Sequence, residues 1–192
     1  MAYFDKETYE RKRNYAYRVS SEGLEKIATQ LVLEDPKYEN ADLDDETIHE
    51  QIESEIEDLI YELEPIAELS HKRHEIHSDG HDTSFDFSFQ DSEIIDNANE
   101  INKKYNLNKN EIPYPNTEDL PSLDDDNWLL CEEFDLDEDE WLDEDGDWIG
   151  DKYEDIYEMV VERVREEKDR WSDSVRKWFR TLNEKFGTDF PD

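Results

Sequence analysis

The sequence contains little of several residue types on which common functions depend. It has one cysteine, five glycines and 21 lysines and arginines, against 57 aspartates and glutamates. The single cysteine, Cys131, excludes an internal disulfide and leaves no CxxC metal motif. The chain has no glycine-rich phosphate loop and no G-x-S-x-G motif, and the neighbouring Glu132 and Glu133 disfavour the thiolate form of Cys131. These absences argue against an enzyme.

Long apolar runs are also missing from the sequence. No window approaches the roughly 18 apolar residues that a membrane-spanning helix needs. No N-terminal stretch joins a basic region to an apolar run of signal-peptide length. We therefore expect a cytoplasmic protein that does not bind a membrane.

The residues that are present predict a folded, mainly α-helical protein with a small core. Hydrophobic residues make up only 34% of the chain, but aromatic residues reach 12%, and disordered chains are usually poor in these. Apolar residues recur at helical spacing in four stretches, residues 20–33, 42–64, 94–104 and 151–186. We expect Asp151 to cap the last of these helices and Gly187 to end it.

One segment indicates a different secondary structure. Phe85, Phe87 and Phe89 alternate with polar residues, which is typical of a short strand or extended segment. An α+β fold with one small strand element is therefore the alternative fold class. By sequence, the chain divides into a helical region, 1–110, which includes an acidic helix at 42–64, a proline-containing acidic loop, 111–127, and an acidic-aromatic segment with the long last helix, 128–192. We expect residues 1–110 and 128–192 to form one compact unit.

The negative charge is concentrated in two blocks of the chain. The formal net charge is −36, of which residues 34–70 carry −14 and residues 118–158 carry −19. Residues 1–33 and 159–192 are nearly balanced, at +1 and 0. A chain that is acidic only for solubility has no need of this separation, so the two blocks are the candidate functional regions.

Calcium binding is one explanation for the second block, "DLDEDEWLDEDGD". An EF-hand loop requires the pattern D-x-[DN]-x-[DN]-G-x5-E, with glycine in sixth place. If Gly146 is sixth, the first and twelfth ligand positions fall on Trp141 and Lys152. If Gly150 is sixth, the fifth position falls on Ile149. Both registers fail, so the sequence predicts no dedicated calcium site.

Zinc binding is a second explanation to weigh, because four of the five histidines gather in "SHKRHEIHSDGHD". Histidine is a common zinc ligand, and spacings of three and four residues can place two imidazoles on one helical face. Ser78, Asp79 and Gly80 interrupt that face before His81, and the H-E-x-x-H pattern is absent. We therefore favour a polar connecting loop and predict no metal and no cofactor, although metal binding at His71, His74, His77 and His81 remains open.

The second block also contains regularly spaced aromatic residues. Phe134, Trp141 and Trp148 lie seven residues apart, and "WLDEDGD" is followed by the similar "WIGDKYE". This spacing indicates that the aromatic side chains share one face and attach an acidic surface to the core. The alternative is a solvated acidic segment, which is what most charge runs are.

The acidic helix in the first block has a carboxylate density close to that of DNA. Residues 44–64 span about 30 Å as a helix and include ten acids, or about one per 3 Å, whereas one strand of B-DNA carries one phosphate per roughly 3.4 Å. The isoleucines of residues 42–64 recur on one face of this helix. Five of the acids form a stripe on the nearly opposite face: Glu46, Glu50, Glu53, Glu57 and Glu64. Because repulsion within such a row destabilises the fold, its presence suggests a use.

In acidity, size, helicity and aromatic content, the chain resembles the DNA-mimic proteins of phages and plasmids that block restriction enzymes or CRISPR effectors. The resemblance implies a protein of an infected or plasmid-bearing bacterium that occupies the nucleic-acid groove of a host defence nuclease without binding nucleic acid itself. The residues expected to bind this partner are Asp44, Asp45, Glu46, Glu50, Glu53, Glu57, Glu64, Asp135, Asp137, Asp139, Glu140, Asp143, Glu144, Asp145, Asp147 and Asp151.

Two other functions remain open at the level of sequence. An acidic chaperone or antitoxin would bind a basic protein, and a regulatory module would bind through its acidic-aromatic segments. Competition distinguishes them, because only a mimic is excluded when nucleic acid already occupies the target. The identity of the partner and the formation of a homodimer also remain open.

Overall fold

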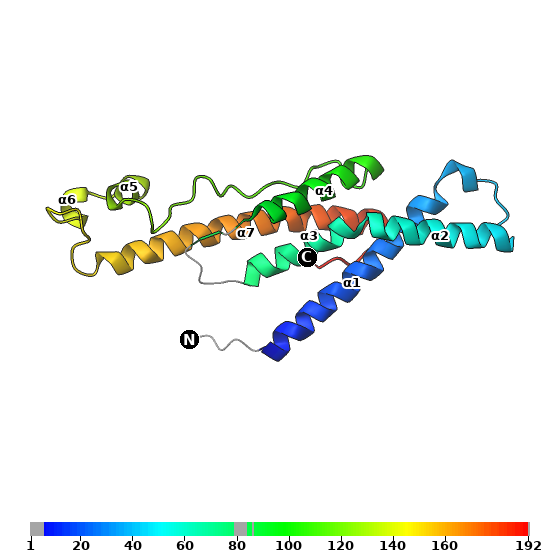
Figure 1. Cartoon of the computed structure of the whole chain (residues 1–192), viewed down its shortest axis with the longest axis horizontal. Coiled ribbons are helices and arrows are strands. Elements are labelled where there is room, and N and C mark those ends of the chain that lie inside the picture. Colours follow the sequence, from blue (N-terminus) through cyan, green and yellow to red (C-terminus); the bar gives the residue numbers. More distant parts are fainter. Residues whose placement is uncertain (1–5, 79–83, 86, 192) are drawn as a thin grey trace. The chain divides into compact units, whose positions relative to one another are not determined.

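The computed structural model describes residues 6–78, 84–85 and 87–191, most of which lie in α-helices (Figure 1). The mainly α-helical fold predicted above is therefore confirmed. The helices of the described part of the chain are α1 (Lys6–Leu33), the short 3-10 helix η1 (Pro36–Tyr38), α2 (Glu46–Glu62), α3 (Glu64–Ser78), α4 (Phe89–Tyr105), α5 (Asn127–Glu133), α6 (Glu138–Trp141) and α7 (Lys152–Phe186).

The chain forms two compact units that are interleaved in sequence. Unit 1 contains Met1–Glu75, Phe89–Pro113 and Asp173–Asp192, and unit 2 contains Ile76–Ser88 and Tyr114–Ser172. Helix α7 contributes its first part to unit 2 and its last part to unit 1. The division predicted from sequence, 1–110, 111–127 and 128–192, runs in chain order and stays a prediction.

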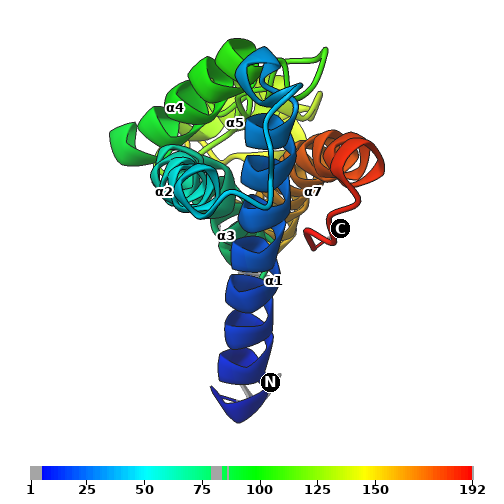
Figure 2. The ribbon, with the colours of Figure 1, turned by 90° about the vertical axis from the view of Figure 1, so that its right-hand side faces the viewer.

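Unit 1 contains α1, α2, α4, nearly all of α3 and the C-terminal part of α7. Figure 2 shows α1 between α2 and this part of α7. Gly23 of α1 allows a close approach, because a Cβ there would lie 2.7 Å from ring carbons of Phe190, which is buried and packs on Phe179 at 5.1 Å between ring centroids. A larger residue at Gly23 would therefore displace the C-terminal segment.

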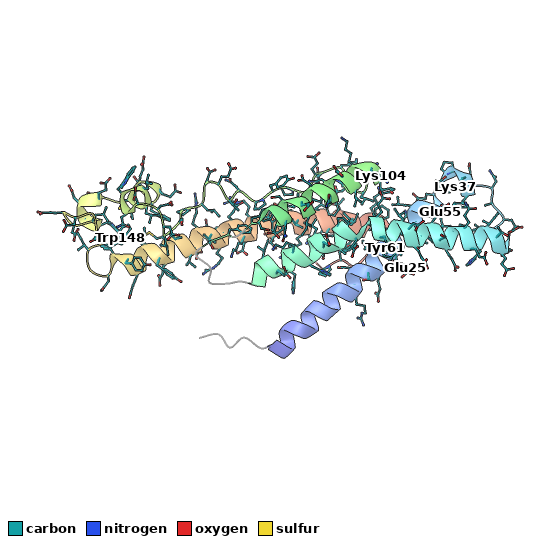
Figure 3. All side chains as sticks on the ribbon, viewed as in Figure 1. Glu25, Lys37, Glu55, Tyr61, Lys104 and Trp148 are labelled. Atoms are coloured by element: carbon teal, nitrogen blue, oxygen red, sulfur yellow. The ribbon has the colours of Figure 1, made fainter. Side chains whose placement is uncertain are left out.

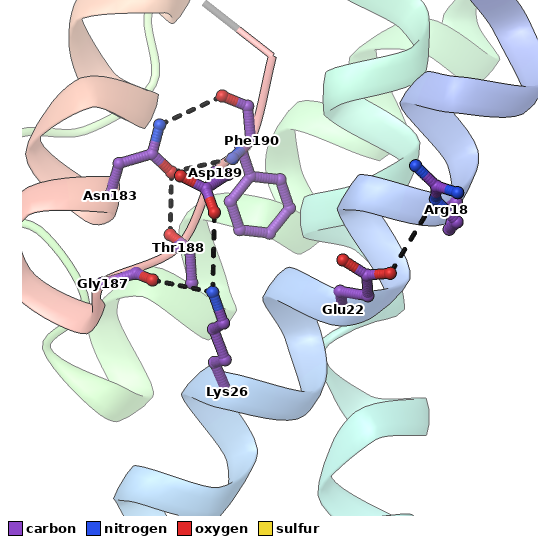
Figure 4. A network of polar contacts seen from close by, with 8 residues as sticks. All are labelled: Arg18, Glu22, Lys26, Asn183, Gly187, Thr188, Asp189 and Phe190. Carbon is purple, nitrogen blue, oxygen red and sulfur yellow. Dashed lines mark hydrogen bonds and ion pairs between the residues drawn. The ribbon is translucent and has the colours of Figure 1, made fainter.

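The end of α7 is fixed by polar contacts to α1 and to its own last turn (Figure 4). Gly187 has φ +64, a conformation that favours glycine, and its N–H donates to the Asn183 carbonyl at 2.9 Å, as expected of a helix-ending residue. Lys26 of α1 donates to the Gly187 carbonyl at 3.0 Å and pairs with Asp189 at 3.6 Å. The prediction that the last helix ends at Gly187 is confirmed.

The histidine-containing stretch is helical, so the prediction of a polar connecting loop there was wrong for residues 71–78. The stretch itself is mostly polar, and the apolar stripe of its helix begins earlier in α3. Ile66, Leu69 and Ile76 of this stripe are buried at helical spacing. Arg73 on the same stripe is buried and donates to the Pro191 carbonyl at 2.8 Å. His81 lies outside the described residues.

The small strand proposed as an alternative does not form among the described residues 84–85 and 87–88, and Phe89 already belongs to α4. Phe85 and Phe87 instead pack edge-on against Trp171 of α7, at 6.4 and 6.0 Å between ring centroids. No neighbouring strand is present in the described part of the chain to pair with their backbone groups. Packing of Phe85 and Phe87 on Trp171, and not strand pairing, accounts for these two positions.

Candidate partner-binding surfaces

Helix α2 forms where the sequence supplies a cap and an apolar stripe. The Asp45 side chain accepts hydrogen bonds from the backbone N–H groups of Thr47, at 2.9 Å, and Ile48, at 3.4 Å, which satisfies two donors at the helix start. Ile52 and Leu59 are buried, and α2 packs against α1. The opposite side of α2 is therefore left to solvent.

Helix α2 ends just before Pro65, a residue that ends or kinks a helix. Helix α2 stops at Glu62, Leu63 keeps helical dihedrals (φ −81, ψ −3), and α3 starts at Glu64. Pro65 lies in the first turn of α3, where a residue without an N–H is tolerated. Figure 1 shows α3 following α2 directly along the chain, with its axis turned away from that of α2.

Two of the ten carboxylates between residues 44 and 64 pair with lysines from other elements of unit 1. Glu55 forms an ion pair with Lys37 at 2.6 Å, and Glu62 forms one with Lys104 and accepts a hydrogen bond from the Tyr105 hydroxyl at 2.6 Å (Figure 3). The two glutamates lie seven residues, or about two helical turns, apart. Each is paired by a lysine that precedes a tyrosine in sequence.

The same contacts shift the pKa values of these groups. The hydrogen bond from Lys37 lowers the pKa of Glu55, and the hydrogen bonds from Lys104 and then Tyr105 lower the pKa of Glu62. The pKa values of Lys37 and Lys104 are raised by the same bonds. Both glutamates are therefore ionised over a wide pH range, and their ion pairs link α2 to other parts of unit 1.

The remaining carboxylates include a row on the solvent side of α2 and the start of α3. Glu46, Glu50, Glu53, Glu57 and Glu64 are all exposed, as predicted, and the one ion pair found for them among the described residues joins Glu53 to His49 at 3.4 Å. We call these five residues the acidic row. Without Glu55 and Glu62, the 21 residues from 44 to 64 carry about one carboxylate per 4 Å, still close to the 3.4 Å of one DNA strand.

Asp44 and Asp45 differ from the acidic row although both are exposed. The carboxylate of Asp45 caps α2, and the backbone N–H of Asp44 donates to the Asp42 side chain at 3.2 Å. These residues therefore belong to the turn that starts the helix. Their carboxylates extend the negative surface, but Asp45 also has a structural role.

The second predicted surface, residues 135–151 of unit 2, consists of turns and one short helix, α6. The predicted partner-binding residues of this segment are all exposed. The Asp137 side chain caps α6 by accepting from the Asp139 N–H at 3.1 Å. Asp143 accepts from the N–H groups of Asp145, at 2.9 Å, and Asp147, at 3.0 Å. The carboxylates of Asp137 and Asp143 thus stabilise the backbone that presents the others.

The aromatic residues of this segment meet across a turn. Leu142 and Trp148 form an antiparallel bridge, which brings the rings of Trp141 and Trp148 into edge-to-face contact at 6.4 Å between centroids. The Lys152 ammonium lies 4.0 Å from the centre of the Trp141 ring, a cation–π contact. Trp141 and Trp148 lie together, as the seven-residue spacing predicts, but a turn brings them together and no continuous helix does. That Phe134 shares this face stays a prediction.

The metal hypotheses can be compared with this geometry. Across the described residues, no group of three or more histidine, cysteine, aspartate or glutamate side chains is arranged to hold a metal ion. In the loop considered for calcium, one oxygen of Asp143 accepts the two backbone hydrogen bonds given above. Cys131 is buried, and burial raises the pKa of its thiol, which disfavours the reactive thiolate.

The structure also reveals exposed apolar residues that sequence reasoning missed. Tyr153 and Tyr157 follow the apolar stripe of α7, yet their side chains are 51% and 39% exposed. Spacing alone cannot distinguish such positions from buried ones, because it does not show which part of the stripe another element covers. Trp128 and Leu129 of α5 and Ile149 are exposed as well, so unit 2 combines acidic and apolar surface.

Comparison of the chain with protein families, curated proteins and solved structures finds no match in any of the three. Within the described ranges, no helix combines the length and apolar character needed to cross a membrane. The functional argument therefore rests on the residues and geometry of the chain itself.

Proposed function

We propose that this protein is a DNA-mimic inhibitor that occupies the nucleic-acid groove of a bacterial defence nuclease, either a restriction enzyme or a CRISPR effector. It acts by occupancy, without catalysis and without binding nucleic acid. The observation that carries the proposal is the acidic row, a line of exposed carboxylates on a helix whose two other glutamates, Glu55 and Glu62, are paired internally.

The physical basis is competition for a positively charged groove. Surfaces that bind DNA obtain much of their affinity when lysines and arginines replace the counterions condensed on phosphates. A helix that fixes carboxylates at a similar spacing can contact the same lysines and arginines. Because the helix is already folded, little side-chain and backbone ordering opposes binding.

The segment 135–151 contributes a second carboxylate surface to this proposal. Its turns are braced by Asp137 and Asp143, so the remaining acids are presented from ordered backbone. We propose that both surfaces face basic regions of the partner, and that the protein works in the cytoplasm of an infected or plasmid-bearing bacterium.

Charge reversal in the acidic row tests the proposal. The triple variant Glu50→Lys, Glu53→Lys and Glu57→Lys should lose inhibition of its target by at least roughly tenfold, since each exposed charge contributes up to about 1 kcal/mol and reversal replaces attraction with repulsion. The measurement is DNA binding by a panel of purified restriction and RNA-guided nucleases, with and without the protein. The helix should persist, because lysine is nearly as good a helix former as glutamate.

The matched control reverses three exposed helical glutamates of unit 1 outside the row: Glu93→Lys, Glu100→Lys and Glu184→Lys. It changes the net charge by the same amount and should inhibit nearly as well as the parent. Equal inhibition by the row variant and the control would show that net charge, and not the row, is responsible.

A second function is supported by the exposed apolar residues of unit 2. A chaperone, antitoxin or regulatory partner of a basic protein would use acids together with aromatic anchors, and Trp128, Tyr153 and Tyr157 are exposed in this unit. Such a protein would be expected to lose binding on Trp128→Ala and to keep binding when DNA occupies the partner. The mimic is expected to lose binding when DNA occupies the partner.

A further inference from the structure

A pocket of about 380 Å³ in unit 1 lies where α1 meets α2 and α3. This volume falls within the range of roughly 300–1,000 Å³ that is usual for ligand pockets. Its apolar walls come from Leu24, Ile60 and Ala67, and its polar groups are Ser21, Tyr61, Glu64, Glu68 and His71. Figure 3 shows Tyr61 near the place where α1 crosses α2.

The pocket lies on the same side of α2 and α3 as the acidic row. At about 100° per residue, Glu50, Glu53 and Glu57 fall within the same arc of about 80° as Tyr61, Glu64 and Glu68. Leu63 between the two helices has φ −81 and ψ −3, and Tyr61 of α2 lines the same pocket as Glu64 and Glu68 of α3. Glu64 belongs to both features, and the acidic row therefore leads into the pocket.

Tyr61 is the aromatic residue of the pocket. Its side chain is 76% exposed, the largest exposed fraction among the large hydrophobic residues of the described chain. It interrupts the acidic row and lines the pocket. A phenol ring beside two carboxylates gives a cation both a π-face and charged acceptors.

We infer that this pocket receives an arginine side chain from the basic surface of the partner, an inference that rests on the proposed function. A guanidinium stacks on an aromatic ring and forms paired hydrogen bonds to carboxylates, whereas an ammonium is a compact and strongly hydrated charge. Glu64 and Glu68 lie four residues apart and hence neighbour one another on α3. Leu24, Ile60 and Ala67 provide the apolar walls against which the arginine stem packs.

Charge complementarity selects this occupant over an uncharged one. An apolar helix in the pocket would bring apolar surface against Glu64 and Glu68 and remove them from water, which is costly unless a charge pairs with them. An arginine supplies that charge and extends the contacts of the acidic row. The acidic row thus ends at the pocket. An arginine bound in the pocket fixes the position of the partner along the row.

The experiment measures binding of octa-arginine and octa-lysine peptides, which carry equal side-chain charge, to the full chain by calorimetry at moderate salt. The parent should bind octa-arginine at least tenfold more tightly than octa-lysine. Ala67→Leu, which fills the pocket without changing charge, should reduce this ratio to near one while leaving octa-lysine affinity unchanged. Tyr61→Ala should reduce the ratio as well, and Tyr153→Ala, at an exposed tyrosine of unit 2, should keep it.

The outcomes separate this inference from the proposed function. Two outcomes would overturn the pocket assignment: equal affinity of the parent for both peptides, or a preference for octa-arginine that persists in both Ala67→Leu and Tyr61→Ala. Neither outcome bears on the acidic row, which the triple lysine variant tests separately. Undiminished binding of both peptides by the triple lysine variant would contradict the role of the row. Sedimentation velocity could also show that the parent is a dimer and that Ala67→Leu converts it to a monomer. That result would assign the pocket to a second copy of the chain and overturn the assignment to an arginine side chain.

Discussion

The two acidic regions of the molecule present their carboxylates by different means. On α2, regular helical geometry spaces the acidic row, and the charges that face the rest of unit 1 are paired with Lys37 and Lys104. In residues 135–151, turns and a single helical turn present the acids, and some of the acids themselves hold those turns in place. Removing one acid therefore has different consequences in the two regions.

Single substitutions should make this difference visible in stability. Asp143→Ala removes the acceptor of two backbone N–H groups and should lower the free energy of unfolding by about 1–2 kcal/mol. Glu53→Ala removes the same charge from the exposed row and should change it by no more than about 0.5 kcal/mol. Because each variant removes one negative charge, relief of overall repulsion is similar in both.

Urea unfolding followed by circular dichroism measures both variants against the parent. The comparison is sharpened if Asp143→Asn, which keeps one acceptor oxygen, recovers part of the loss. Equal stabilities of Asp143→Ala and Glu53→Ala would show that the acids of the turn have no more structural importance than those of the row.

A smaller effect should distinguish the paired glutamates of α2 from its exposed row. Because Lys104 lowers the pKa of Glu62 below its ordinary value of 4.5, the pair contributes stability above that pH and loses it as the pH falls through the lowered pKa. Lys104→Met should therefore be less stable than the adjacent Lys103→Met at pH 7. The difference should shrink as the pH falls through the lowered pKa of Glu62, because the protonated carboxyl no longer pairs with Lys104.

The two lysine variants carry the same net charge, so the comparison isolates the pair from general electrostatics. Lys103 is exposed, and no ion pair is found for it within the described residues. Unfolding free energies measured across this pH range test the assignment. A difference that stays constant from neutral to acidic pH would mean that Glu62 does not titrate as part of the pair.

The sequence predicted the regular parts of this molecule better than its long-range contacts. The isoleucine stripe predicted α2 and its exposed row, because apolar periodicity and burial are directly linked. Gly187 marked the end of α7 for a similar local reason. The helix through His71 and His74 was missed because polar residues dominate the stretch, while its apolar stripe starts earlier, at Ile66.

The candidate site was only partly predictable for the same physical reason. Lys37 and Lys104 lie 18 and 42 residues from the glutamates they pair with, and no local pattern reveals such contacts. The pocket beside Tyr61 depends on where α1 crosses α2 and α3, which spacing within one helix does not determine. By contrast, the "DEDGD" turn residues were visible in the sequence and could have indicated that Asp143 binds its own backbone.

The central claim is that the acidic row and DNA occupy the same groove, and order-of-addition binding tests it most directly. A nuclease that the protein inhibits is immobilised, saturated with its DNA or guide-bound nucleic acid, and then exposed to the protein at several salt concentrations. The account predicts that saturating nucleic acid excludes the protein, that added protein weakens DNA binding reciprocally, and that both affinities fall steeply as salt rises. Undiminished binding of the protein to the DNA-saturated nuclease would contradict the account.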